Sequence, residues 1–82
     1  MSEIRQLKLG QREQLRQKIK TLEAQAANDV VLIEMKTYAY KQDLTKLDID
    51  AILQAAKDLF TAITHLREAK ALSEELNAEL YD

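Results

Sequence analysis

Cysteine and proline are both absent from this 82-residue chain, and glycine occurs once. Without cysteine the chain has no disulfide, no thiol nucleophile and no cysteine-ligated zinc or iron–sulfur site. A single glycine excludes a glycine-rich phosphate loop, and the scarcity of turn residues leaves a multi-stranded sheet without its connections. Abundant Ala, Leu, Gln, Glu, Lys and Arg favour helix instead. The composition therefore predicts an all-α fold.

Long apolar runs are also missing. The longest run of large apolar residues is Val30 to Ile33, within the least polar stretch, NDVVLIEMKTYAYK at residues 28–41. A helix that crosses a bilayer needs about 20 apolar residues, and MSEIRQLKLG at the amino terminus lacks the apolar core of a signal peptide. We therefore expect a cytoplasmic protein without a membrane partner.

The spacing of the apolar residues predicts two long helices. From Leu15 to Leu47 they recur at alternate steps of four and three, if Thr37 is admitted, with one extra four-residue step that ends at Val30. Such an insertion locally unwinds a left-handed supercoil. Val, Ile, Thr and Tyr in residues 28–41 also allow a strand, but no second β-rich run is present to pair with it. The alternation resumes in the second half at Ile52, Ala56, Leu59, Ile63 and Leu66.

The break between the two helices is expected in LTKLDIDA, residues 44–51. Asp48 can accept hydrogen bonds from the free amide groups of a new helix, and Asp50 adds negative charge at its positive end. Thr45 and Asp48 offer an alternative capping box, which moves the start of the helix back by about one turn. Either cap predicts a second helix that continues to about Leu80.

These features predict one domain, residues 10–82, folded as an antiparallel two-helix hairpin with a long first helix and a turn near residues 45–50. Gly10 leaves residues 1–9 as a frayed first turn, a separate arm or an extension of the first helix. A break at Asn28–Asp29 would give three helices. The apolar spacing continues through that point, which favours two.

Charge is distributed unevenly along the chain. Residues 1–22 carry six Lys or Arg against two Glu, whereas residues 23–82 carry six against twelve Asp or Glu. Basic residues on one helix face favour contact with phosphates. The segment 5–20 therefore supports one alternative function, a nucleic-acid-binding regulator with contacts from Arg5, Arg12, Arg16, Lys18 and Lys20.

An antiparallel hairpin folded about Asp48 would neutralise this basic segment. Both helices rise ~1.5 Å per residue, so facing residues have numbers that add to roughly 96. This register brings two basic residues to acidic ones, Lys20 to Glu75 and Arg16 to Glu79. Exposed ion pairs contribute only ~0–1 kcal/mol each, but they cancel the local field. Nucleic acid is therefore the less favoured partner.

Closing the hairpin leaves apolar residues without cover. A soluble monomer rarely exposes a large apolar patch, and two hairpins that pack by two-fold symmetry into a four-helix bundle would bury it. A heterologous partner, such as a client helix held in an apolar groove by a small helical chaperone, is another alternative. The residues predicted to form this dimer or partner interface are Val31, Leu32, Met35, Tyr38, Ala39, Leu53 and Phe60, with Ile49 and Ala62 beside them.

Catalytic, metal and cofactor signals are weak. His65 and Glu68 lie three residues apart, a nonspecific spacing that we interpret as a surface pair, and Ser2 and Ser73 have no histidine nearby in sequence. Only Arg12, Arg16 and Lys36 are candidates to line a cavity for an anionic substrate, and salt bridges explain them more simply. Tyr81 is expected to be exposed and without a role. We therefore expect no enzyme, no metal and no cofactor.

What remains is a small non-enzymatic interaction protein. An adaptor, an assembly factor or a regulator that forms a homodimeric coiled-coil bundle and contacts other proteins fits the composition and the apolar pattern. This expectation rests on elimination, because a fold alone does not specify a function.

Overall fold

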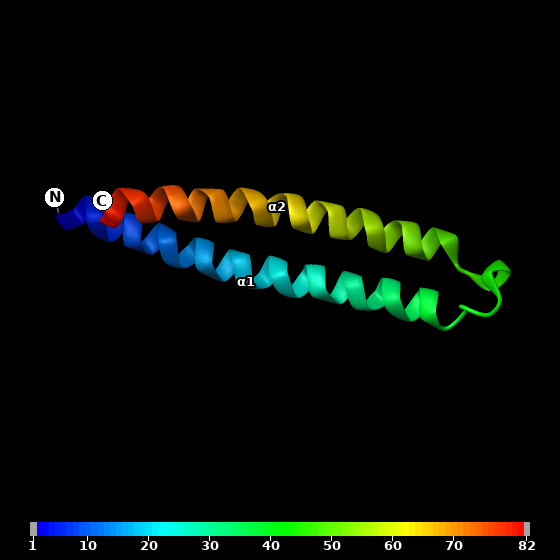
Figure 1. The fold of residues 1–82 in the computed structure, drawn as a ribbon. Coiled ribbons are helices and arrows are strands. Elements are labelled where there is room, and N and C mark those ends of the chain that lie inside the picture. The colour runs from blue at the N-terminus through cyan, green and yellow to red at the C-terminus, as the bar shows by residue number, and fades with distance from the viewer. Residues whose placement is uncertain (1, 82) are drawn as a thin grey trace.

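The computed structural model describes residues 2–81, which form a helical hairpin (Figure 1). Helix α1 spans Ser2–Tyr38, the short 3₁₀ helix η1 spans Leu44–Lys46, and helix α2 spans Ile49–Tyr81. The two long helices lie antiparallel, with the start of α1 and the end of α2 at one end of the molecule and the connection at the other. The molecule measures 63 × 17 × 14 Å. The predicted all-α hairpin is confirmed.

Helix α1 begins before Gly10 and runs through it. Glycine in a helix costs about 1 kcal/mol relative to alanine but does not by itself stop the helix. Contacts with the end of α2 hold this first part in place: Arg5 Nη1 donates to the Leu80 carbonyl at 3.1 Å, and Lys8 Nζ lies 3.0 Å from Glu79 Oε2. Residues 2–9 therefore extend α1 and form no separate arm; Met1 lies outside the described residues.

The first helix continues through Asn28–Asp29, so the two-helix prediction is confirmed, but it ends at Tyr38, earlier than expected. The connection occupies residues 39–48. After Tyr38 the backbone N atoms of Tyr40 and Lys41 donate to carbonyls three residues back, and Asp43 caps η1: its Oδ1 accepts from the Thr45 backbone N at 3.2 Å and from the Thr45 hydroxyl at 2.6 Å. Such local side-chain bonds compete with helical ones. Thr45 is thus used by η1 and not by the alternative capping box.

Helix α2 begins at its predicted cap. Asp48 Oδ1 accepts a hydrogen bond from the Ala51 backbone N at 3.1 Å, and the Asp48 carbonyl accepts from the Ile52 N at 3.0 Å. Asp50 lies in the first turn, where its negative charge is favourable. The sequence-based prediction for this helix start is confirmed.

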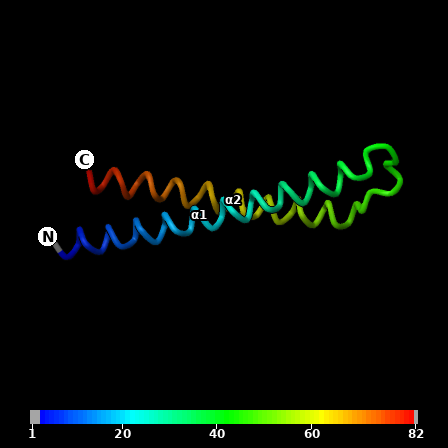
Figure 2. The backbone as a smooth tube through the Cα atoms, turned by 90° about the horizontal axis from the view of Figure 1, so that it is seen from below, coloured from blue at the N-terminus to red at the C-terminus, as the bar shows by residue number. Residues whose placement is uncertain are grey.

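The residues of α1 that face α2, here called the α1 seam, follow an uninterrupted alternation of four and three. The extra step predicted at Val30 is wrong, because Val30 is 40% exposed and Asp29 takes the inward place. A constant heptad keeps one seam against the partner helix while the helices wind around each other, and Figure 2 shows them crossing near mid-length. The α1 seam consists of Lys8, Arg12, Leu15, Ile19, Leu22, Ala26, Asp29, Ile33 and Lys36.

The core on α2 is built from alanines one heptad apart. Ala56 and Ile63, predicted for the α2 seam, lie off it, whereas Ala62, predicted to be left over, is 5% exposed and belongs to it. Small residues let the two backbones approach closely, but no large side chain in the described part of the chain is fully buried. The core is therefore thin. Its buried α2 members are Ala55, Ala62, Ala69, Leu76 and Leu80.

The register also differs from the prediction. Glu79 pairs with Lys8, and Lys70 Nζ lies 3.8 Å from Glu23 Oε1, so the numbers of facing residues add to about 90 instead of 96. The physical reason is the early end of α1, which moves the fold-back point toward the amino terminus. The predicted pairing of Arg16 with Glu79 is wrong; Arg16 lies 3.9 Å from Glu13 of its own helix.

Candidate functional site

Exposed apolar side chains concentrate in the half of the hairpin next to the connection. On α2, the apolar residues outside the seam recur at alternate steps of four and three, which places them in one row along the helix. Phe60 is 74% exposed, Ile49 69% and Leu53 51%. We call this row the Phe60 face. It consists of Ile49, Leu53, Ala56, Phe60 and Ile63.

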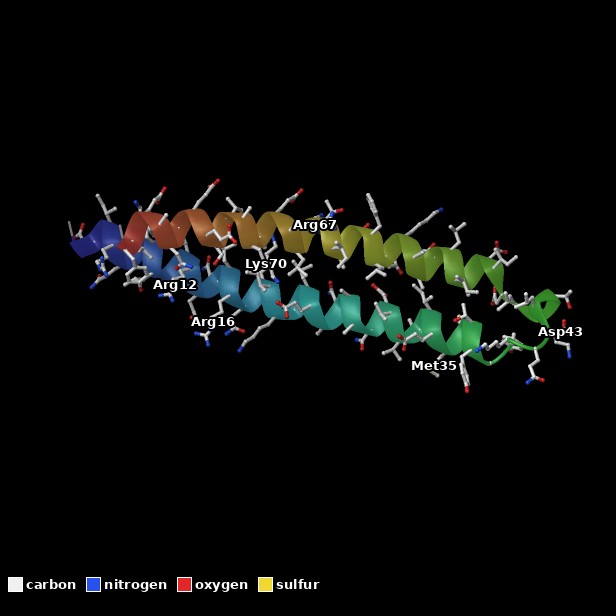
Figure 3. All side chains as sticks on the ribbon, in the orientation of Figure 1. Arg12, Arg16, Met35, Asp43, Arg67 and Lys70 are labelled. Carbon is white, nitrogen blue, oxygen red and sulfur yellow. The ribbon has the colours of Figure 1, made fainter. Side chains whose placement is uncertain are left out.

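Val30 of α1 borders the Phe60 face. The ion pair between Glu23 and Lys70 shows which sides of the two helices adjoin, and Figure 3 places Lys70 between the helices. One heptad further toward the connection, the corresponding positions are Val30 on α1 and Ile63 on α2. At this level of the same face, Val30 and Ile63 therefore take the positions that correspond to Glu23 and Lys70.

A second apolar surface lies on α1 and points in other directions. Met35 is 63% exposed and Tyr38 77%, and Figure 3 shows Met35 on the side of α1 turned away from α2. Val31 and Leu32 are also exposed, at 49% and 44%. We call Val31, Leu32, Met35 and Tyr38 the Met35 face.

The Met35 face and the Phe60 face are separate surfaces. Gln25, one heptad before Leu32, lines a cleft of about 410 Å³ with His65. Each helical residue turns by about 100°, so Gln25 and Glu23 lie on opposite sides of the seam residue Leu22. Leu32 is therefore on the opposite side of the hairpin from Val30. The single patch expected from the sequence is divided between two faces.

All seven residues of the predicted interface are exposed, but only two of them, Leu53 and Phe60, lie on the Phe60 face. Ala39 is in the connection, just after α1. Beside it, Met35, Tyr38, Leu44 and Leu47 line an open cleft of about 770 Å³ at the end of the hairpin. Sequence reasoning missed Leu44 as part of this surface, because the predicted first helix continued through it and placed it in the seam.

The basic segment proposed for nucleic-acid contact is partly occupied by the carboxyl-terminal end of α2. Lys18 lines a cleft of about 460 Å³ with Glu75 and Glu79. Arg5 and Arg12 engage Tyr81, whereas Arg16 and Lys20 have exposed side chains. The expected juxtaposition of basic and acidic ends is present, although the individual pairs differ from those predicted.

Tyr81 has a structural role that its terminal position does not reveal. The guanidinium carbons of Arg5 and Arg12 lie 5.8 Å and 5.4 Å from the centre of its ring, and Arg12 Nη1 donates to the Tyr81 hydroxyl at 2.8 Å. An exposed cation–π contact contributes about 0.5–1 kcal/mol. Tyr81 is 60% exposed as expected, but it joins the first turns of α1 to the last turn of α2.

Replacing Tyr81 with alanine is expected to lower the free energy of unfolding by about 1 kcal/mol, because both cation–π contacts are lost. Urea denaturation at fixed protein concentration measures this. Tyr81→Phe is the matched control, since it keeps the ring and removes only the exposed hydroxyl bond. Equal stability of the alanine and wild-type proteins would show that the contact contributes nothing.

The polar cleft around His65 offers limited chemistry. It is lined by Asn28, Asp29, Asp58 and His65 among others, but the described part of the chain contains no group of three or more acidic or histidine side chains placed to hold a metal ion. Over the same residues, neither helix combines the length and apolarity needed to cross a membrane. Comparison of the chain with protein-family models, with curated proteins and with solved structures gives no match.

Proposed function

We propose that this chain is a small, non-enzymatic interaction protein of the cytoplasm, an adaptor, assembly factor or regulator that acts through homodimerisation and protein–protein contacts. One observation carries the proposal. Many large apolar residues of the half next to the connection are turned outward on two faces, while two inward positions of the α1 seam at that level are taken by Asp29 and Lys36. Charged residues in the seam bury little apolar surface, while neighbouring apolar residues stay exposed. Such a seam is poorly suited to stabilise an isolated hairpin.

The thin core supports the same proposal. Small domains bury a low fraction of their surface and usually depend on a disulfide, a metal or another subunit. The chain has no cysteine, and the buried side chains of its α2 seam are mostly alanine. Burying the exposed Phe60 side chain would contribute about 1.5–3 kcal/mol. Another subunit is therefore the source of stability that the exposed residues favour.

The experiment is a measurement of molar mass by light scattering or sedimentation equilibrium at about 1–100 µM. The proposal expects twice the chain mass of 9.4 kDa. Gel filtration alone would mislead, because a 63 Å rod elutes ahead of a sphere of equal mass. A stably folded monomer across this concentration range would overturn the proposal.

A further inference from the structure

The Phe60 face has the same order of large and small side chains in both directions along α2. From Ile49 to Ile63 the order is large, large, small, large, large, with Ala56 at the centre. A row of this kind is self-complementary when a second copy lies against it in the opposite direction. Two-fold symmetry requires such self-complementarity, because the same patch is used on both subunits.

We propose that the occupant of the Phe60 face is the Phe60 face of a second copy, packed antiparallel about a two-fold axis at Ala56. This inference rests on the proposed function and adds to it the face, the direction and the centre of the dimer contact. In this packing Ile49 lies against the partner's Ile63 and Leu53 lies against the partner's Phe60. The two Ala56 residues meet on the axis, where their small side chains let the α2 helices approach closely.

Charges at the borders of the face favour this occupant. Between Ile49 and Ile63, α2 carries Asp50, Lys57 and Asp58, so the face has no band of one sign that would select an oppositely charged helix. Beyond Ile63 the same row continues with Arg67, Lys70 and Glu74, which are exposed. The apolar contact therefore ends after 14 residues of rise, about 21 Å. An identical α2 helix has an apolar row of matching length.

The Phe60 face is an apolar strip along one helix. It is about 21 Å long and about 10 Å wide, the diameter of one helix, which is on the order of 200 Å² in projection. A standard interface buries ~800 Å² per subunit, so the contact must also bury the flanks of α2 and the border residue Val30. Phe60 at 74% exposure is the largest single contributor, and aromatic residues are frequent anchors of such interfaces.

Disulfide trapping tests the centre of the contact, because the chain has no cysteine of its own. Ala56→Cys should form a covalent dimer under mild oxidation, since a disulfide requires Cα atoms about 4.4–6.8 Å apart and the axis brings the two positions together. Ala71→Cys is the matched control, another exposed alanine of α2 that lies off the face. At about 10 µM, we expect the Ala56→Cys protein to cross-link at least about tenfold faster than the Ala71→Cys protein.

Two further variants test whether the two α2 helices pack antiparallel. Ile49→Cys and Ile63→Cys should each cross-link slowly alone and rapidly when mixed, with mass spectrometry identifying the mixed dimer. Parallel packing would instead link each variant to itself. This pair also provides an independent result if the Ala56→Cys protein folds poorly.

The outcomes separate this inference from the proposed function. A dimer by mass in which Ala56→Cys cross-links no faster than Ala71→Cys, and in which Ile49→Cys and Ile63→Cys form no mixed product, overturns the assignment of the face and leaves the homodimer intact. If the protein is a dimer by mass but a helix of another protein binds to the Phe60 face, the occupant is heterologous, and this result also overturns the assignment of the face. A folded wild-type monomer overturns both proposals.

Discussion

Replacing Leu76 with alanine is expected to lower the free energy of unfolding by about 2–3 kcal/mol. Leu76 is 8% exposed and is one of only two leucines among the buried residues of α2. Truncating a buried leucine removes its transfer free energy and leaves a cavity, at a cost of about 2–5 kcal/mol in well-packed cores. The lower part of that range applies here because the core is one layer thick and open to solvent on both sides.

The control for this substitution lies one turn away. Leu72→Ala removes the same atoms from the same helix, but Leu72 is 53% exposed, so we expect a loss below about 0.5 kcal/mol. Urea denaturation of both variants and of the wild type must be compared at one protein concentration, since the stability of a dimer depends on it. If the two leucine variants lost equal stability, the assignment of the α2 seam would be wrong.

Replacing Phe60 with glutamate is expected to weaken the homodimer by at least about 100-fold. A central aromatic anchor is typically worth 2 kcal/mol or more when truncated, and each symmetric dimer carries the change twice. A carboxylate in an apolar contact adds a desolvation cost. Because Phe60 is 74% exposed in the single chain, the hairpin itself does not need this side chain for its own packing. The dissociation constant from sedimentation equilibrium measures the effect.

Met35→Glu is the matched control for the Phe60 substitution. Met35 is 63% exposed, comparable to Phe60, and lies in the same half of the molecule on the other apolar face. We expect the Met35→Glu protein to remain dimeric, with a dissociation constant within about threefold of the wild type, as is usual for exposed substitutions away from a contact. If Met35→Glu dissociated the dimer and Phe60→Glu did not, the Met35 face would be the dimer contact.

The two faces also suggest a division of tasks. If the Phe60 face is occupied by a second copy, the Met35 face and the open cleft beside Leu44 and Leu47 remain exposed on each hairpin near the middle of the dimer, because the register places Met35 level with Ala55, next to the axis. A methionine-containing apolar surface adapts to partners of different shape because the side chain is flexible and polarisable. Protein–protein contacts of the dimer are therefore expected at these two exposed surfaces, and substitutions at Met35 should affect partner binding without changing the molar mass.

Prediction of the seam failed where charge replaced hydrophobicity. After Ala26, the apolar pattern predicts that Val30 and Thr37 occupy the seam. In the structure, Asp29 and Lys36 occupy it instead. The alternation of four and three from Leu15 to Ala26 already predicts positions 29 and 36 as the next seam positions. The less polar residues lie one position later in each case, and the prediction followed them. The long side chain of Lys36 can cover the seam with its methylene groups and keep its charge in water. Asp29 is too short to do so and instead lines the polar cleft with Asn28 and Asp58.

Local physics determined much of this protein. The absence of proline and cysteine, the single glycine and the helix-favouring composition predict two long helices, and the Asp48 cap places the start of α2. These properties depend on residues close to one another in the chain, where propensity and capping act. No distant contact is needed to derive them.

Only the tertiary structure decided the register, the seam and the division of the apolar surface. Helix α1 ends at Tyr38, earlier than its apolar pattern predicted, and this moves every facing pair. The change in pairing buries Ala62, frees Ala56 and brings Tyr81 against Arg5 and Arg12. A helix presents residues around its whole circumference, and which of them face inward depends on where the other helix lies.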